Sequence, residues 1–216
     1  EKRVKRSLLK EIRNISKLNI SMQSIRQGEA KGLGHAILCA KRLIGKEPFA
    51  VVLPDMLISK KNGNIGDSLK EMKLNFEKHE ISSILLGKAK KADIPKYGIV
   101  QIKKNSKLSG LGLVEKIIEK PSIKKAPSNL YAVGRYIFNN NFFRYLSKVK
   151  PDKSDEIQLT DAIDDYIKDK NKVSAFSLDG EVFDCGDNAE YILANLEFAM
   201  KDPAMKTKIK NFIKTR

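Results

Sequence analysis

The sequence predicts an α/β fold with a central mixed, mostly parallel sheet flanked by helices. Strand-like apolar runs alternate along the chain with segments of helical periodicity, which is typical of βαβ units. Two of those runs, 48–55 (PFAVVLPD) and 81–89 (ISSILLGKA), are almost continuously apolar, as expected of strands covered on both faces. No internal repeat or linker divides the chain, so we expect a single domain over residues 1–216.

The expected helices are the segments in which apolar residues recur every three or four positions. They cover residues 2–17, 34–43, 67–78, 140–149, 155–169, 188–200 and 204–215. The expected strands are short apolar runs marked off by Gly, Pro or Asn. They cover residues 18–25, 48–55, 81–89, 97–103, 112–121 and 129–139, followed by a strand pair at 173–180 and 181–186.

Composition indicates a globular protein, because 41% of the 216 residues are hydrophobic and 31% are charged. No apolar run approaches the roughly 20 residues that span a bilayer, so no membrane association is expected. Cys39 and Cys185 lie far apart, and only His35 and His79 could join them, which argues against a disulfide framework or a structural zinc. A reducing, cytoplasmic setting is therefore expected.

The formal net charge of +16 raises nucleic-acid binding as an alternative function. Lysine supplies most of the basic residues, whereas base-edge readers favour arginine for its bidentate fork. The lysines are scattered through almost every segment, and the aromatic residues show no stacking pattern. We therefore expect solvated lysine faces, some attraction for anionic small molecules, and no nucleic-acid partner.

The glycine-rich segment 26–36 (RQGEAKGLGHA) has two interpretations. Glycines 28, 32 and 34 would let a planar or anionic group approach the backbone at the start of a helix. A flexible loop that caps the helix explains the same residues equally well. The segment is neither a P-loop nor a Rossmann fingerprint.

Two aspartates are candidates for a metal site. Asp55 directly follows an apolar strand, and Asp184 lies between an apolar strand and a glycine turn. A divalent cation would offset the desolvation of such carboxylates, and hard oxygen ligands suit Mg²⁺. Asp55 alone is a weak signal, because a turn aspartate after a proline is common.

The segment 117–121 (IIEKP) places Glu119 and Lys120 next to each other at a strand end. Neighbouring side chains of a strand point to opposite sides, so these two are poorly placed to pair with each other. One can bond sugar hydroxyls while the other meets a phosphate. Taken alone, the pair is more often an exposed Glu-Lys dipeptide.

In this order, the segments RQGEAKGLGHAILCA, PFAVVLPD, YGIV, VEKIIEKP, APSNLYAVGRYIF, DEIQLTDAI and FDCGDNAEY resemble bacterial UTP–glucose-1-phosphate uridylyltransferases, also called UDP-glucose pyrophosphorylases. The resemblance covers essentially the whole chain. It implies a Rossmann-like nucleotidyltransferase fold, with UTP and glucose 1-phosphate as substrates and UDP-glucose and pyrophosphate as products. It also implies a homo-oligomer.

The resemblance also implies roles for particular residues. Those expected to hold the uracil are Gln27 and Gly32. Asp55 and Asp184 are expected to bind Mg²⁺, and Lys120 is expected to bind the sugar phosphate. Asp55 and Lys120 are the expected catalytic residues. Those expected to contact glucose or line its pocket are Gly98, Glu119, Val133 and Gly134. Arg135 and the segment 155–161 are expected to support the site.

The sequence departs from the family before residue 26. The family begins with a strand, a glycine-rich phosphate loop containing Thr and Arg, and a Lys-Pro-Lys segment, and nothing here resembles them. We therefore expect the 216 residues alone to turn over substrate slowly. A non-catalytic relative that binds UDP-glucose is an alternative. A thymidylyltransferase is another, although the segment 26–36 favours uridine.

Overall fold

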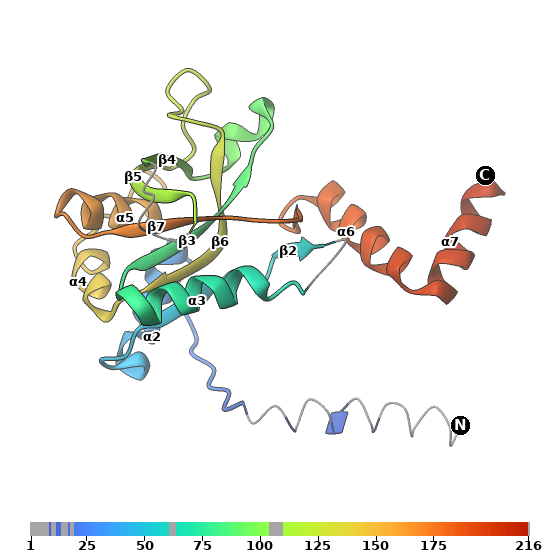
Figure 1. The fold of residues 1–216 in the computed structure, drawn as a ribbon, viewed down its shortest axis with the longest axis horizontal. Coiled ribbons are helices and arrows are strands. Elements are labelled where there is room, and N and C mark those ends of the chain that lie inside the picture. Colours follow the sequence, from blue (N-terminus) through green and yellow to red (C-terminus); the bar gives the residue numbers. More distant parts are fainter. Residues whose placement is uncertain are drawn as a thin grey trace.

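The computed structural model describes Leu9, Ile12, Arg13, Lys17 and residues 20–60, 64–103 and 110–215. The helix expected at 2–17 therefore lies mostly outside the described residues. The described chain forms a body with a central sheet, from which a helical arm projects (Figure 1).

The central sheet has six strands in the order β1-β6-β3-β7-β5-β4. Their bounds are Phe49–Val52 (β1), Ser82–Lys88 (β3), Ile99–Lys103 (β4), Gly112–Ile118 (β5), Leu130–Phe138 (β6) and Val173–Ser177 (β7). The sheet is mixed, as predicted, but the prediction that it is mostly parallel is wrong. Of the described neighbouring pairs only β3–β7 is parallel, because β6 lies antiparallel between β1 and β3, and β5 lies antiparallel between β7 and β4.

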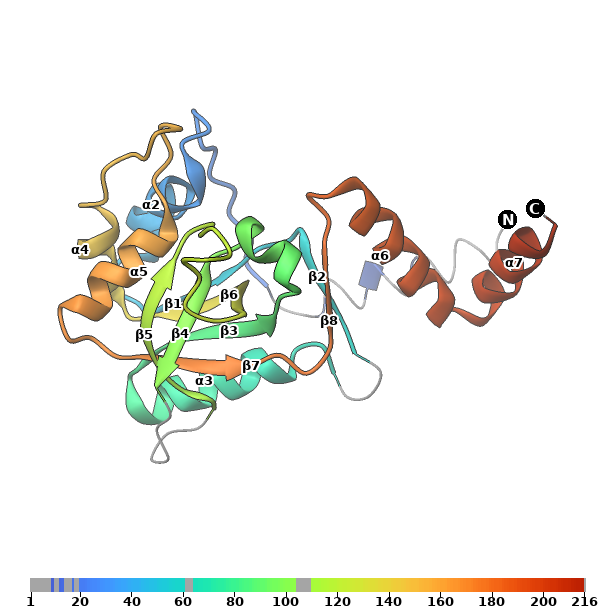
Figure 2. The ribbon, with the colours of Figure 1, turned by 90° about the horizontal axis from the view of Figure 1, so that it is seen from above.

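Helices cover both faces of this sheet (Figure 2). On one face lie α2 (Gly32–Ile44), α4 (Phe143–Leu146) and α5 (Leu159–Lys168), whereas α3 (Asp67–His79) lies on the other. Two hydrophobic clusters result. The larger cluster contains Phe138 and Ile163, and the smaller contains Met72 and Val133. Short 3₁₀ helices at Lys91–Lys96 and Asn140–Phe142 complete the body.

Local chemistry explains where several helices begin and end. Asp67 lies in the first turn of α3, where a carboxylate interacts favourably with the helix dipole. Gly45, with φ of 65°, ends α2. Asp187 caps the helix that follows it by accepting hydrogen bonds from the backbone of Ala189 and Glu190.

A second, two-stranded sheet connects the body to the arm. It pairs β2 (Met56–Ser59) antiparallel with β8 (Glu181–Asp184), and we call it the ribbon. The arm consists of α6 (Asn188–Lys201), which packs on β8 and β2, and α7 (Pro203–Lys214), which packs on α6. No residue of α7 is buried in the described structure.

The structure corrects several expected elements. Residues 20–25 form no strand, and within the described chain β1 pairs only with β6, at the edge of the sheet. The expectation that β1 is covered on both faces is wrong, because Ala50 and Val52 on one of its faces are exposed. The segments 173–180 and 181–186 do contain strands, but β7 joins the central sheet while β8 pairs with β2. Residues 155–158 precede α5 and are not helical.

None of the described helices combines the length and the apolar character that crossing a bilayer requires.

Candidate active site

One cavity of about 320 Å³ brings together most of the predicted site residues. It lies where β1 ends, β4 and α5 begin, and the ribbon meets the central sheet. The predicted residues that line it are Asp55, Gly98, Glu119, Lys120, Gly134 and Asp184. Leu53, Met56, Tyr97 and Ala132 supply part of the remaining wall.

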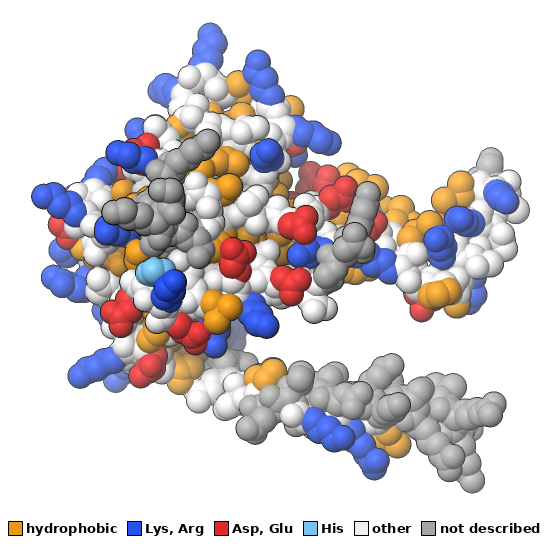
Figure 3. Space-filling view, viewed as in Figure 1, with side chains coloured by type: hydrophobic (Ala, Val, Ile, Leu, Met, Phe, Trp, Pro, Cys, Tyr) orange, Lys and Arg blue, Asp and Glu red, His pale blue; other side chains and the backbone are white. Residues whose placement is uncertain are grey.

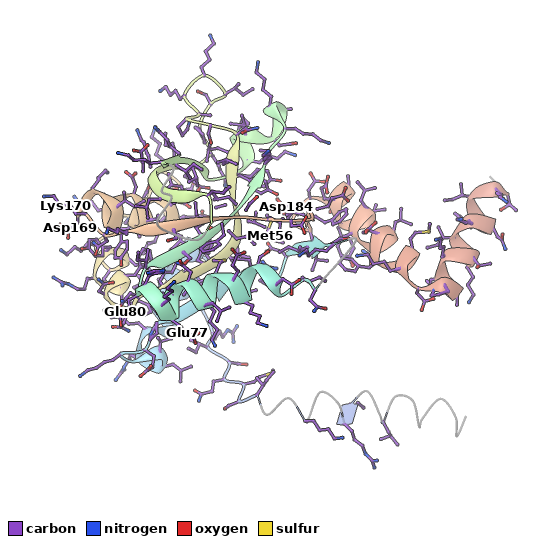
Figure 4. The ribbon with its side chains drawn as sticks, viewed as in Figure 1. Met56, Glu77, Glu80, Asp169, Lys170 and Asp184 are labelled. Carbon is purple, nitrogen blue, oxygen red and sulfur yellow. The ribbon has the colours of Figure 1, made fainter. Side chains whose placement is uncertain are left out.

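The two aspartates come together because of the ribbon. Met56 pairs with Asp184 in the register of β2 and β8, and Figure 4 labels both residues at the same end of the ribbon. One step further on, the backbone N–H of Cys185 donates to the carbonyl of Asp55 over 2.9 Å. The N–H of Gly186 donates to Oδ1 of Asp184 over 3.1 Å, which orients that carboxylate.

Arg135 fixes the turn that carries Asp55. Its Nη1 donates to the carbonyl of Leu53, and its Nη2 donates to the carbonyl of Met56, each over 2.8 Å. The guanidinium thus spans the residues on either side of the Pro54–Asp55 turn. Burial lowers the pKa of Arg135, and the nearby Asp55 carboxylate opposes that shift. The expectation that Arg135 supports the site agrees with these contacts.

The donor set at this turn suits Mg²⁺. Asp55 and Asp184 offer carboxylate oxygens, whereas no group of three or more His, Cys, Asp and Glu side chains among the described residues could hold a metal ion. Mg²⁺ is commonly bound through one or two carboxylates, with water and substrate phosphates as its other ligands. Two aspartates at the rim of a cavity fit that arrangement.

Glu119 is a half-buried carboxylate held by α5. The hydroxyl of Thr160 donates to Oε2 of Glu119 over 3.1 Å, and Gly98 faces both residues. Burial raises the pKa of the Glu119 carboxyl above its usual value, and the Thr160 hydrogen bond offsets part of that increase. The carboxylate is therefore retained in a place that disfavours its charged form, as is common at ligand-binding sites.

This burial predicts a pH dependence of stability. Because the folded pKa of Glu119 is raised above 4.5, its contribution to folding is fully present below pH 4.5 and is lost as the pH rises through the folded pKa. Glu119→Gln cannot ionise and avoids that loss. The Tm of this variant minus that of the unmodified chain should therefore increase between about pH 4 and pH 8, as thermal unfolding measures. Glu115→Gln, which lies exposed on β5 just before Glu119, is the control. A difference independent of pH contradicts the assignment.

Lys120 and Gly134 have left-handed backbone conformations at the cavity wall. Lys120 has φ of 41°, and its backbone N–H donates to the carbonyl of Tyr97 over 3.1 Å. Gly134 has φ of 69°, and a Cβ there would lie 2.8 Å from the side chain of Leu53. Left-handed backbone is costly for a lysine, so the strand end is held in an unusual shape where Lys120 meets the cavity.

Three predicted residues do not line this cavity. Gln27 Nε2 donates to the carbonyl of Gly32 over 3.1 Å and lies 2.9 Å from Nδ1 of His35. Gly32 does not line the cavity, although its neighbour Leu33 does. The side chain of Val133, a residue predicted to line the sugar pocket, is fully buried, because alternation along β6 turns it into the smaller hydrophobic cluster.

The glycines of the segment 26–36 have a packing role that the sequence interpretation missed. The N–H of Gly34 donates to the carbonyl of Ile157 over 2.9 Å, and a Cβ on Gly34 would lie 2.6 Å from that oxygen. A Cβ on Gly32 would lie 2.9 Å from Cβ of Glu156. These two glycines thus allow α2 to dock closely against the segment before α5.

Gly34→Ala should therefore destabilise the protein by about 1–3 kcal/mol, the usual cost of overpacking. Gly28→Ala is the matched control, because nothing lies within 4 Å of a Cβ at that position. Urea unfolding of both variants measures the difference. Equal stability of the two variants contradicts the close docking of α2.

The sequence interpretation assigned Thr160 only to the supporting segment 155–161 and did not single out Lys96 or Tyr97. Thr160 holds Glu119, Lys96 lines the wall next to Tyr97, and Tyr97 stacks on Tyr131 with ring centroids 4.5 Å apart. Lys96 directly precedes the YG dipeptide, and this position could have indicated that Lys96 belongs to the site. The role of Thr160 depends on a contact between α5 and β5, which no local pattern reveals.

The fold is that of a nucleotidyl transferase, since the family model described as "Nucleotidyl transferase" matches residues 1–201. The UTP–glucose-1-phosphate uridylyltransferase of Haemophilus ducreyi is 42% identical over 216 residues, which cover 99% of this chain and 73% of that protein. The chain therefore belongs to the UTP–glucose-1-phosphate uridylyltransferase family.

Solved structures agree with this assignment. A UDP-glucose pyrophosphorylase in complex with UDP-glucose superimposes with a TM-score of 0.83 at 36% identity, over 92% of this chain and 73% of that one. A UTP-bound enzyme from Acinetobacter baumannii gives a TM-score of 0.83 at 33% identity, over 98% of this chain and 72% of that one. The predicted Rossmann-like nucleotidyltransferase fold is thus confirmed.

Proposed function

We propose that this chain transfers the uridylyl group of UTP to glucose 1-phosphate, giving UDP-glucose and pyrophosphate. The observation that carries the proposal is the cavity that joins the Asp55/Asp184 pair to Glu119 and Lys120. The names of the family relatives support the same reaction. A phosphoryl transfer of this kind needs positioning and charge neutralisation rather than a covalent intermediate.

In the proposed reaction, a phosphate oxygen of glucose 1-phosphate attacks the α-phosphorus of UTP in line. The new P–O bond forms as the bond to the β-phosphate breaks, and pyrophosphate leaves. Lys120 contributes a positive charge to the sugar phosphate, since this residue lines the cavity. Glu119 accepts hydrogen bonds from glucose hydroxyls, and the backbone at Gly98 and Gly134 leaves room for the ring.

Asp55 and Asp184 would hold Mg²⁺. Bound there, the ion neutralises negative charge on the phosphates. Arg135 keeps the Asp55 turn in place, and the Gly186 N–H keeps the Asp184 carboxylate in place. Each aspartate is thereby held for metal binding by contacts within this chain.

Gln27 and Gly32 are proposed to bind the uracil. The hydrogen bond from Gln27 to the Gly32 carbonyl orders the glycine-rich segment, and Leu33 connects that segment to the cavity. A base lying at the start of α2 would place the α-phosphate toward the carboxylate pair.

A homo-oligomer stays a prediction, as does the single-domain organisation of residues 1–216. A cytoplasmic location is also proposed, in keeping with the free thiols of Cys39 and Cys185.

Nucleic-acid binding is less well supported. Basic side chains lie around the rim of the face in Figure 3, interrupted by acidic and apolar ones, rather than in one continuous patch. Binding to a duplex would depend on phosphate contacts made by lysine and arginine. The cavity instead combines the two aspartates and the half-buried Glu119 with Lys120, which suits a small nucleotide sugar.

A product assay tests the proposal. The chain is incubated with UTP, glucose 1-phosphate and Mg²⁺, and UDP-glucose is quantified by chromatography. We expect UDP-glucose above the protein-free background, and none when EDTA replaces Mg²⁺. Saturable UDP-glucose binding without any product formation would favour the non-catalytic alternative.

A further inference from the structure

The helix α6 is anchored on the ribbon at two separate points. The first is the turn after β8, where the N–H of Asp187 donates to the carbonyl of Asp184 over 2.9 Å. Asp187 also caps α6 through the N–H groups of Ala189 and Glu190. The start of α6 is thus joined directly to the turn that carries Asp184.

The second anchor lies near the other end of α6 and consists of Ser59, Glu197 and Lys201, which we call the Ser59 clasp. The Ser59 hydroxyl donates to Oε1 of Glu197 over 2.6 Å and accepts from Nζ of Lys201 over 2.7 Å. Lys201 Nζ lies 3.6 Å from Glu197 Oε1 and donates to the carbonyl of Lys60 over 3.2 Å. Ser59 is only 4% exposed, so this polar group is buried with both of its roles satisfied.

The two anchors lie at opposite ends of the ribbon. Met56 pairs with Asp184 at one end, and Ser59 pairs with Glu181 at the other. The 14 residues of α6 span about 20 Å at 1.5 Å per residue, so the helix bridges the ribbon lengthwise. Figure 1 shows α6 leaving the body at the ribbon and continuing into α7. The clasp is thus the polar contact that fixes the far end of α6, in addition to the packing of α6 on β8 and β2.

We propose that the Ser59 clasp positions the Asp184 carboxylate relative to Asp55, and so sets the affinity of the carboxylate pair for Mg²⁺. The proposal rests on the function proposed for that pair. Ser59, Glu197 and Lys201 touch no substrate in this scheme. They are positioning residues that act through α6 and the turn at 184–187.

The test uses two variants of the chain. Ser59→Ala removes two of the hydrogen bonds between α6 and the ribbon and leaves the one from Lys201 to Lys60. Lys201→Met keeps the aliphatic stem and removes the ammonium; this side chain is 41% exposed, so the variant is expected to fold even where Ser59→Ala is not. Lys73→Met, which breaks an exposed ion pair with Glu77 on α3, is the control.

Two measurements are made on each variant. Hydrogen exchange, without ligand or metal, reports on the amides of Cys185, Gly186 and Asp187, which bond within the turn and to Asp55. UDP-glucose binding is then titrated against Mg²⁺ concentration. We expect faster exchange at these amides and a Mg²⁺ half-saturation about 10-fold higher in both clasp variants, the scale typical of groups that orient metal ligands. The control should match the unmodified chain.

Unchanged exchange and unchanged Mg²⁺ half-saturation in the clasp variants would overturn the proposal. Asp55→Ala separates that failure from failure of the proposed function. If Asp55→Ala loses Mg²⁺-dependent binding while the clasp variants keep it, only the positioning role is wrong. If Asp55→Ala itself keeps Mg²⁺-dependent binding, the carboxylate pair is not the metal site and both proposals fall.

Discussion

Asp55→Ala is expected to abolish the Mg²⁺-dependent part of UDP-glucose binding. The Asp55 turn is held by Arg135, and Asp184 is the other carboxylate at this rim of the cavity. With one of two carboxylates removed, a hard cation keeps too few protein oxygens to be held beside the phosphates. The loss should be nearly complete rather than partial.

Thermal shift measures this effect. At a ligand concentration of 100 times Kd, binding stabilises a folded protein by about 2.7 kcal/mol. Mg²⁺ should add to the shift that UDP-glucose gives to the unmodified chain but not to the shift in Asp55→Ala. Asp165→Ala, which removes an exposed carboxylate paired with Lys168, is the control. An equal Mg²⁺ increment in Asp55→Ala and in the unmodified chain contradicts the metal site.

Lys120→Met should weaken UDP-glucose binding by about 10- to 100-fold. A hydrogen bond to a charged group is worth roughly 1.5–3 kcal/mol, and the Lys120 ammonium is the proposed partner of the sugar phosphate. Methionine retains the length and apolar stem of the side chain. The backbone bond to Tyr97 does not involve the side chain, so the strand end should keep its shape.

Calorimetric titration gives the Kd for both forms. Lys124→Met, a few residues downstream in an exposed turn, is the matched control for the loss of one positive charge. The control separates a local contact from the general attraction of a chain with net charge +16 for anions. The same loss of affinity in both variants would show that Lys120 acts only through net charge.

The sequence predicts those parts of the fold whose signals are local. The apolar periodicity of α3 and α5 and the continuous apolar run of β3 identify these elements directly. The strand β2 was missed because its four residues continue the apolar run past Pro54. Its partner β8 lies far along the chain, so neither the ribbon nor the separation of β8 from β7 follows from local pattern.

In the site, too, local sequence signals identify some residues, whereas others depend on contacts between distant segments. Asp55, Glu119 and Lys120 stand at strand ends, where polar residues after an apolar run are conspicuous. Thr160 and the role of Arg135 depend on contacts between distant segments. At Gly34, the sequence is equally compatible with ligand approach and with close packing.

The central claim is that the cavity between Asp55, Asp184, Glu119 and Lys120 binds a nucleotide sugar together with a divalent cation. A crystal structure of the chain with UDP-glucose and Mn²⁺ tests it most directly, because the anomalous signal of Mn²⁺ locates the ion. The predicted result is an ion about 2.0–2.3 Å from carboxylate oxygens of Asp55 and Asp184, as usual for such cations, with the glucose ring beside Glu119. A nucleotide sugar bound elsewhere, or an ion away from both aspartates, would contradict the claim.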